Sequence, residues 1–271
     1  MASIAPPINP GHFFGQLRDL ARLAPDHVAR AGLIVATARL WIRKRRGRRE
    51  GPLVTVRLRG PRGPLTLRLG NYTDLEAVHE VFVSGTYARV AGVEADTILD
   101  LGGNCGASMA YFKALHPKAR IHVAEPDPIA FRTLTANAAG LSDVVLHQVA
   151  VGGTDERRPF YQSNAAWSSS LVGDQVRAGG QWIDVEVVSL GTLLGRASLE
   201  RVDLLKLDVE GAEWEILPAV QLADVAGVVI GELHDPTDEG QAVLDRAFAG
   251  FEVEFLEDPP SHFVATGRPA A

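Results

Sequence analysis

The sequence predicts an α/β protein built on a mostly parallel β-sheet with helices on both faces. From about residue 96 onwards, segments with the pattern of strands alternate with segments with the pattern of helices. Long connections of this kind are typical of parallel strands joined by helical crossovers. The last two predicted strands are joined only by residues 258–261. So short a link cannot make a parallel crossover, and we therefore expect the final strand to be antiparallel.

The elements of this part follow from apolar periodicity and from turn residues. The predicted strands cover residues 97–101, 121–125, 144–149, 202–207, 227–232, 251–257 and 262–266. The predicted helices lie near residues 105–115, 128–139, 211–220 and 238–249. No internal repeat interrupts this order, so one domain is expected to hold all of these elements.

The N-terminal part has a different pattern. Residues 12–49 are predicted to form two helices broken near Pro25, with Asp26 capping the second. Two alternating segments, residues 53–58 and 64–69, flank the turn sequence R-G-P-R-G and predict a hairpin, and a short helix is expected over 74–83. We therefore divide the chain into an N-terminal helical and β-hairpin extension, 1–85, and a main domain, 86–271.

Composition narrows the class of protein. The chain of 271 residues is 46% apolar and 22% charged, which is ordinary for a globular protein with a substantial core. A net charge of −6 argues against general affinity for nucleic acid. Cys105 is the only cysteine, and no secretory signal pattern is evident, so a reducing, cytoplasmic location is expected. The most apolar early segment, residues 31–42, is shorter than the roughly 18 residues of a membrane span.

Residues 97–106 read T-I-L-D-L-G-G-N-C-G, an apolar strand that breaks into a glycine turn before a predicted helix. Glycines without a β-carbon would let the backbone approach a nucleotide-like ligand closely. The next predicted strand ends at Glu125, where Pro126 stops it. An acid about 20 residues after such a turn hydrogen-bonds a ribose in Rossmann-type folds. The pattern therefore predicts a ligand that carries an adenosine.

Two residues of the turn indicate which kind of ligand. Asn104 occupies the position of the second glycine in the dinucleotide fingerprint G-x-G-x-x-G. Asp100 lies just before the turn, where its carboxylate would repel a pyrophosphate and attract a cationic amino acid tail or a sulfonium. An NAD(P)-dependent oxidoreductase is therefore the weaker alternative.

A third motif, V-D-L-L-K-L-D-V-E-G-A-E-W, covers residues 202–214. Its leucines predict a buried strand from whose end Asp208 emerges, with Glu210 at the start of the following helix. Lys206 lies inside that strand and should be paired with Asp208 or Asp203, because a buried ammonium group requires a partner.

The next predicted strand ends in G-E-L-H-D, residues 231–235. Glu232 and His234 are therefore expected at the same edge of the sheet as Asp208, where ligands bind in open α/β sheets. The N/D-P-P-Y/F element of nucleic-acid amino-methylating enzymes is not present at the end of the fourth strand, so methylation of bases is disfavoured.

Together these residues resemble the FkbM-type S-adenosylmethionine-dependent methyltransferases. The resemblance is carried by D-L-G-G-N-C-G (100–106), A-E-P-D-P (124–128) with Asn137 downstream, L-L-K-L-D-V-E-G-A-E (204–213) and I-G-E-L-H (230–234). It implies a Rossmann-like class I methyltransferase fold, a seven-stranded sheet whose last strand is antiparallel, and S-adenosyl-L-methionine as cofactor. It also implies O-methylation of a small-molecule hydroxyl on a macrolide, another polyketide or its sugar, or of a glycan or glycolipid sugar.

The predicted site has a cofactor side and a substrate side. The cofactor-binding set comprises Asp100, Gly102, Gly103, Asn104, Gly106, Glu125, Pro126 and Asp208. On the substrate side, the resemblance places Asp208, Glu210, Glu232 and His234. The long segment 156–184 carries aromatic and hydroxyl side chains and is interpreted as a connecting loop at the rim of the site, or as an edge hairpin packed on the core. From it Trp167, Ser168 and Ser169 are predicted to contact the substrate.

A neutral alcohol is a poor nucleophile, so a base that removes its proton is expected. His234 has an unperturbed pKa suited to that task, and Asp208 or Glu232 could orient its ring. In the alternative mechanism, Asp208, Glu232 and His234 bind a divalent metal ion that lowers the pKa of the hydroxyl. We favour the metal-free histidine base.

The basic segment 31–49 has three interpretations. In the first, it is an amphipathic helix that lies on an anionic membrane surface, at the inner face of the membrane. In the second, it forms a homodimer interface. In the third, it is a helix packed on the protein with a solvated charged end. The first two interpretations also allow an alternative function, in which the protein is a non-catalytic methyltransferase-like scaffold that binds a membrane or a partner through this segment.

Overall fold

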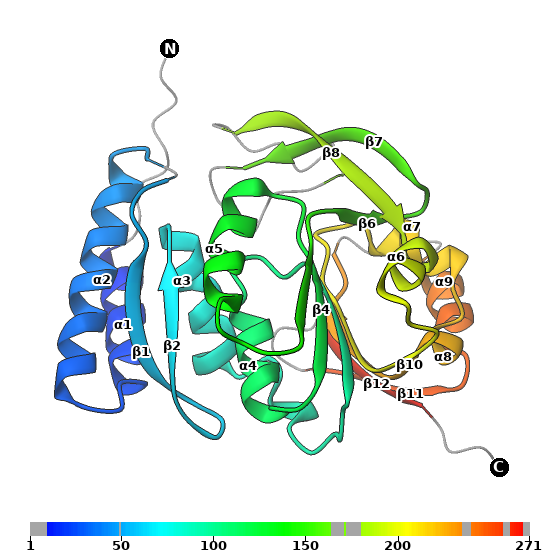
Figure 1. Ribbon diagram of the computed structural model, residues 1–271, viewed down its shortest axis with the longest axis horizontal. Coiled ribbons are helices and arrows are strands. Elements are labelled where there is room, and N and C mark those ends of the chain that lie inside the picture. Colours follow the sequence, from blue (N-terminus) through cyan, green and yellow to red (C-terminus); the bar gives the residue numbers. More distant parts are fainter. Residues whose placement is uncertain are drawn as a thin grey trace.

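The structure is a computed structural model, and it describes residues 10–48, 50–163, 171, 180–234, 240–256 and 261–267. A seven-stranded sheet forms its centre, with the strand order β11-β12-β10-β9-β3-β4-β5 (Figure 1). The strands are β3 Thr97–Leu101, β4 Arg120–Ala124, β5 Val144–His147, β9 Val202–Leu207, β10 Ala226–Glu232, β11 Phe251–Phe255 and β12 His262–Gly267. The predicted α/β class is confirmed.

The predicted direction of the last strand is also confirmed. Strands β10, β9, β3, β4 and β5 run parallel to one another. Strand β12 is antiparallel to both β10 and β11 and lies between them. The chain therefore reaches the edge with β11 and turns back, as the short link at 258–261 requires.

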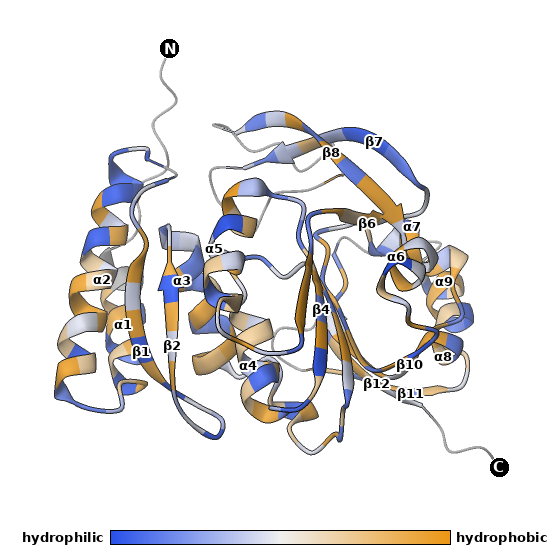
Figure 2. Ribbon diagram, viewed as in Figure 1, coloured by the Kyte–Doolittle hydropathy of each residue, from blue (hydrophilic) through white to orange (hydrophobic). Residues whose placement is uncertain are grey.

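Helices cover both faces of this sheet (Figure 1). They are α4 Ala107–Leu115, α5 Pro128–Ala138, α6 Leu190–Ala197, α7 Glu213–Ile216, α8 Leu222–Val225 and α9 Gly240–Ala247. Two hydrophobic cores result, and neighbouring residues of one strand serve different cores: Leu204 belongs to the first and Leu205 to the second. Successive side chains of a strand point to opposite faces, and both faces of the central strands are covered, which is why most of their residues are apolar (Figure 2).

Three predicted elements differ from the structure. The predicted strand 144–149 ends early, as β5, and a further strand, β6 Ala150–Gly152, follows it and joins a separate three-stranded sheet of order β6-β8-β7. Its partners, β7 Glu156–Gln162 and β8 Gln181–Ser189, are antiparallel strands, so the hairpin alternative for the segment 156–184 holds for these residues and the loop interpretation does not. The outer face of this small sheet carries polar residues, so the sequence of its strands lacks the apolar pattern that identifies the central strands. The predicted helix 211–220 is only α7 followed by a short 3-10 helix, Leu217–Ala219, because Pro218 cannot continue an α-helical ladder.

The N-terminal part contains the predicted helices and hairpin. Its elements are α1 Pro10–Arg22, α2 His27–Arg45, β1 Val54–Gly60, β2 Gly63–Leu69 and α3 Tyr72–His79, followed by a π-helical turn, Glu80–Ser84, and a 3-10 helix, Ala88–Val90. The Asp26 carboxylate accepts a hydrogen bond from the Ala29 amide at 2.8 Å and caps α2 as predicted. The hairpin lies between α1 and α2 on one side and α4 and α5 on the other (Figure 1).

One hydrophobic core spans this N-terminal part and the central sheet. Leu33 of α2 and Leu58 of β1 belong to the same cluster as Phe112 of α4 and Ile121 of β4. The division into 1–85 and 86–271 stays a prediction, and its boundary marks a change of architecture within a continuous core. Among the helices that the structure describes, none is both long and apolar enough to cross a membrane.

Candidate functional site

The predicted site residues meet at the carboxyl ends of four neighbouring strands. The sheet order β10-β9-β3-β4 places side by side the segment with Glu232 and His234, the segment with Asp208 and Glu210, the glycine turn after β3, and Glu125 after β4. Parallel strands expose their carboxyl ends at one edge, so residues more than a hundred positions apart in the chain come together there. Open α/β sheets bind their ligands at this edge, and we call the region in front of these four strand ends the crevice.

Glu125 holds the glycine turn in place. Its Oε2 accepts a hydrogen bond from the Asn104 amide at 2.8 Å, and its Oε1 accepts one from the Asp127 amide at 2.7 Å. Burial, reinforced by the charge of Asp127, raises the pKa of Glu125 to about 8. Asn137 supports the same turn from behind, since its side-chain amide donates to the Cys105 carbonyl at 2.8 Å. Pro126 follows Glu125 directly at the strand end, as predicted.

The glycines of the turn are required by the protein around them. A β-carbon on Gly102 would overlap the Asp208 carbonyl oxygen, and one on Gly103 would overlap the side chain of Val123. Gly102 and Gly106 also have φ angles of 82° and 87°, which favour glycine. The missing β-carbons therefore make room for neighbouring protein atoms, and the close approach of a ligand to the turn stays a prediction.

Lys206 is buried between two acids. Its Nζ lies 3.3 Å from Asp100 Oδ1 and 3.4 Å from Asp208 Oδ2, and it also donates to the Leu101 carbonyl at 3.1 Å. The predicted partner Asp208 is confirmed, whereas Asp203 instead accepts two backbone amides at the start of β3. Because Lys206 compensates the charge of Asp100, that carboxylate attracts a cationic ligand less strongly than the sequence alone suggested.

His234 lies within a ring of carboxylates. Its Nδ1 is 3.2 Å from Glu213 Oε1, and its Nε2 is 3.5 Å from Glu210 Oε2 and 3.7 Å from Glu232 Oε2. The indole of Trp214 donates to the His234 carbonyl and fixes the backbone there. The side chain of His234 is 17% exposed, so one edge of the ring faces the crevice.

These carboxylates change the ionisation of the cluster. Burial alone would lower the pKa of His234, but the hydrogen bond and charge of Glu213, with Asp208 and Glu210, raise it to about 10. Burial and the neighbouring Asp208 raise the pKa of Glu210 well above its usual range. Around neutral pH the imidazole therefore carries a proton in this structure, which does not suit the predicted histidine base, because a general base must be unprotonated.

The metal ligands predicted from the sequence are only partly brought together. Within the described residues, the ligand atoms that lie within 4.8 Å of one another belong to Asp208, Glu210 and His234. Glu232 is engaged elsewhere: its Oε1 accepts from the Ser261 hydroxyl at 2.7 Å, and its Oε2 is 3.6 Å from His262 Nε2. Glu210 therefore replaces Glu232 in the alternative ligand set.

Sequence reasoning gave no role to Glu213 and His262. The side chain of Glu213 is fully buried and accepts hydrogen bonds from the amides of Val209 and Gly211 while it contacts His234. The position of Glu213 in the motif E-G-A-E is the feature of the sequence that could have indicated a role for it. His262 faces Glu232 across the antiparallel ladder, a neighbour that only the strand register could reveal.

The predicted substrate contacts Trp167, Ser168 and Ser169 lie outside the described residues. The strand β7 that precedes them ends beside the cofactor side of the crevice, where the Gln162 amide donates to Asp127. Asp127 also caps α5 through the Ile129 amide at 2.8 Å, as predicted.

The order of the strands, the antiparallel β12 between β10 and β11, and a glycine turn followed by an acid one strand later define a class I S-adenosylmethionine-dependent methyltransferase. Residues 100–259 match the family described as Methyltransferase FkbM domain. The chain belongs to the FkbM methyltransferase family.

Individual relatives are similar over much of the chain. The 31-O-demethyl-FK506 methyltransferase FkbM of Streptomyces tacrolimicus is 28% identical over 72% of this chain and 91% of that protein. The 2-O-methyltransferase NoeI of Sinorhizobium fredii is 33% identical over 44% of this chain and 55% of that protein. The solved structure of Aeropyrum pernix fibrillarin with natively bound S-adenosyl-L-methionine is 13% identical, with a TM-score of 0.45 over 78% of this chain and 81% of that one.

Proposed function

We propose that this enzyme transfers the methyl group of S-adenosylmethionine to a hydroxyl of a specialised metabolite, such as a polyketide or its sugar, or of a glycan or glycolipid sugar. The observation that carries the proposal is the shared crevice, with the turn held by Glu125 on one half and the carboxylates around His234 on the other. The names of two relatives, a 31-O-demethyl-FK506 methyltransferase and a 2-O-methyltransferase, support oxygen as the acceptor.

The residues on the cofactor side fit an adenosine-bearing ligand. Each oxygen of Glu125 accepts one backbone amide and keeps a second lone pair for a ribose hydroxyl. The proposed set remains Asp100, Gly102, Gly103, Asn104, Gly106, Glu125, Pro126 and Asp208. In it, Asp100 acts through Lys206, and the glycines act by shaping the turn.

The reaction replaces one bond by another. The sulfonium carbon–sulfur bond breaks, the sulfur keeps the electron pair, and the carbon–oxygen bond forms to the acceptor. The hydroxyl proton passes to the cluster, where Glu232 lies between His234 and His262 and is the proposed acceptor. Trp167, Ser168 and Ser169 remain the proposed substrate contacts. Positioning of the two reactants in one crevice supplies much of the rate.

Glu125→Ala should weaken the binding of S-adenosylhomocysteine by about 10- to 100-fold, since the variant loses two hydrogen bonds to the ribose that contribute roughly 0.5–1.5 kcal/mol each. Titration calorimetry measures the affinity, and a thermal unfolding curve verifies that the variant is folded. Glu94→Ala, at an exposed acid outside the crevice, is the matched control. Unchanged affinity in folded Glu125→Ala protein would remove Glu125 from the cofactor site.

The function itself is tested with methyl-labelled S-adenosylmethionine and a panel of hydroxylated macrolides, glycosides and glycolipids. Transfer of the label to an oxygen of one acceptor is the expected result. Tight binding of NAD with no binding of S-adenosylhomocysteine would favour an oxidoreductase. Cofactor binding without transfer to any hydroxyl on the panel, together with transfer to nitrogen or carbon acceptors, would contradict O-methylation.

A further inference from the structure

Five acids share three basic side chains around His234. Asp208, Glu210, Glu213 and Glu232 surround the imidazole, His262 lies beside Glu232, and the ammonium group of Lys206 is shared between Asp208 and Asp100. Bringing several carboxylates into a partly buried crevice is costly unless a cation compensates them. The local charge therefore favours a bound cation among the described side chains.

The imidazole is oriented as in histidines that ligate metals. Glu213 lies 3.2 Å from Nδ1 and is itself fixed by the amides of Val209 and Gly211. A carboxylate on one ring nitrogen sets the tautomer and turns the other nitrogen towards a metal. Here Nε2 faces Glu210, at 3.5 Å, on the side of the crevice.

The spacing of the ligand atoms fits one small cation. Two ligands at about 2.1 Å from a metal lie roughly 3–4 Å apart, depending on the angle between them. The oxygens of Asp208 and Glu210 and a nitrogen of His234 lie within 4.8 Å of one another, so a contraction of less than an ångström would close the site. Two carboxylates with one imidazole suit Mn²⁺ or Mg²⁺ and leave positions open for a substrate oxygen.

We propose that Asp208, Glu210 and His234 hold a divalent cation and that Glu213 positions His234 for it. The inference rests on the proposed function, because the cation deepens the role of the same crevice. Such a cation lowers the pKa of a hydroxyl that coordinates it. Glu232, a weak base for a free alcohol, can then take the hydroxyl proton, and the imidazole serves as a neutral ligand instead of a base.

Binding of Mn²⁺ to chelator-treated full-length protein tests the site without any acceptor substrate. Calorimetry or electron paramagnetic resonance should show one Mn²⁺ per chain. Glu210→Gln and His234→Asn should each weaken that binding at least about tenfold, and Glu213→Gln by about 10- to 100-fold. Glu232→Gln is the matched control. It removes a carboxylate of the same cluster that lies outside the ligand set, so it should weaken Mn²⁺ binding clearly less than Glu210→Gln does.

Measuring the S-adenosylhomocysteine affinity of the same samples tests the proposed metal site separately from the proposed methyltransferase function. Wild-type protein that binds S-adenosylhomocysteine but no Mn²⁺ would overturn the metal site and leave the methyltransferase intact. Equal Mn²⁺ affinity in wild type and Glu210→Gln would overturn the ligand set, and so would a loss in Glu232→Gln as large as that in Glu210→Gln. Full methyl transfer after removal of all divalent ions would overturn the role of the cation.

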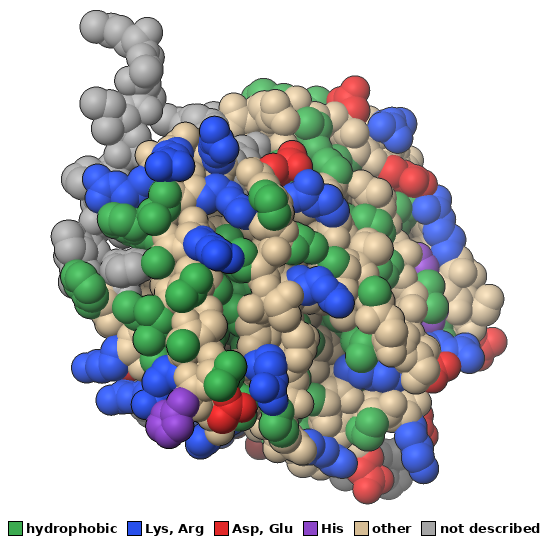
Figure 3. Space-filling view, turned by 60° about the vertical axis from the view of Figure 1, so that its left-hand side comes forward, with side chains coloured by type: hydrophobic (Ala, Val, Ile, Leu, Met, Phe, Trp, Pro, Cys, Tyr) green, Lys and Arg blue, Asp and Glu red, His purple; other side chains and the backbone are tan. Residues whose placement is uncertain are grey.

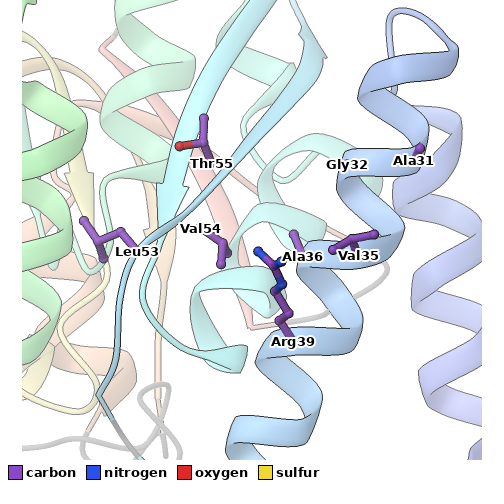
Figure 4. A pocket seen from close by; sticks show the side chains of 8 residues that line it. All are labelled: Ala31, Gly32, Val35, Ala36, Arg39, Leu53, Val54 and Thr55. Carbon is purple, nitrogen blue, oxygen red and sulfur yellow. The ribbon is translucent and has the colours of Figure 1, made fainter.

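An independent surface feature lies on α2, far from this crevice. Val28, Val35 and Ile42 are 79%, 48% and 43% exposed and follow one another at seven-residue intervals, so they form an apolar stripe along the outer side of the helix. The opposite side, with Leu33 and Leu40, packs into the core. Beside the stripe, α2 and residues 53–55 enclose a hollow of about 390 Å³, into which Arg39 also extends (Figure 4).

Positive charge surrounds the α2 stripe although the whole chain is acidic. Residues 27–48 contain seven basic residues and no acid: Arg30, Arg39, Arg43, Lys44, Arg45, Arg46 and Arg48. Arg43 and Lys44 are engaged by the Gly70 carbonyl and by Glu76, whereas Arg39 and Arg46 are exposed. Hydrophobic side chains on this face lie among Lys and Arg side chains (Figure 3). Two such faces would repel each other, so charge complementarity favours an anionic lipid surface over a second copy of the chain.

We infer that the α2 stripe and its arginines lie on an anionic membrane surface. Vesicles with phosphatidylglycerol should bind the full-length protein, vesicles of phosphatidylcholine alone should not, and added salt should weaken binding. Val35→Glu with Ile42→Glu should reduce binding at least tenfold. Leu141→Glu, an exposed apolar residue outside α2, should not. Equal binding by all variants, absence of binding to anionic vesicles, or a dimer in solution that the α2 variants dissociate would each overturn the inference.

Discussion

Replacing Lys206 by methionine should lower the free energy of unfolding by about 3–5 kcal/mol. The Lys206 ammonium is 2% exposed and lies between Asp100, which is fully buried, and Asp208. Methionine retains the volume but leaves two carboxylates without their cation, and removal of one partner from a buried ion pair is strongly destabilising. The same change deletes the hydrogen bond to the Leu101 carbonyl, so the glycine turn should loosen too. Urea unfolding at neutral pH measures the effect.

The double variant Lys206→Met with Asp100→Asn tests whether the unpaired charge of Asp100 causes the loss of stability in Lys206→Met. If the unpaired charge of Asp100 is responsible, the second substitution should restore part of the lost stability, as a coupling energy in a double-mutant cycle. Lys118→Met, at an exposed lysine, should change stability by less than about 0.5 kcal/mol. A loss below 1 kcal/mol in Lys206→Met would show that the pair contributes little to the fold.

Replacing His234 by asparagine should lower kcat by about 10²- to 10⁴-fold, while S-adenosylhomocysteine binds as in wild type. His234 lies at the end of β10, on the half of the crevice away from Glu125, so cofactor binding does not depend on it. Its ring nitrogen faces Glu210, where we place the hydroxyl and its cation. Initial rates of S-adenosylhomocysteine formation with an acceptor from the panel measure the effect.

His27→Asn is the control for that experiment, because His27 is exposed on α2 and contacts none of the crevice residues. A His234→Asn enzyme with a wild-type rate would remove the imidazole from catalysis altogether. A variant that loses cofactor affinity and turnover together would show that His234 organises the crevice as a whole.

The central strands could be predicted almost residue by residue, because each is buried on both faces and therefore mostly apolar. The strand at 202–207 and the antiparallel return of 262–266 are examples, the second from the length of one link. The strands β7 and β8 were predicted only as one of two alternatives, since their small sheet has an exposed, polar outer face and β8 pairs with segments about 20 to 30 residues before it in the chain. An alternating pattern mixed with charges is indistinguishable from a loop until the partner strand is known.

The sequence by itself determined the family, the order of the strands and the acids that end them, because motif residues and strand ends are local properties of the chain. Only the tertiary structure decided what those residues do to one another. It placed Lys206 against Asp100 as well as Asp208, and Glu210 in place of Glu232 beside Asp208 and His234. It also surrounded His234 with acids that raise the pKa of its imidazole to about 10. Charge interactions depend on distance and burial across neighbouring strands, and neither quantity is encoded at any single position.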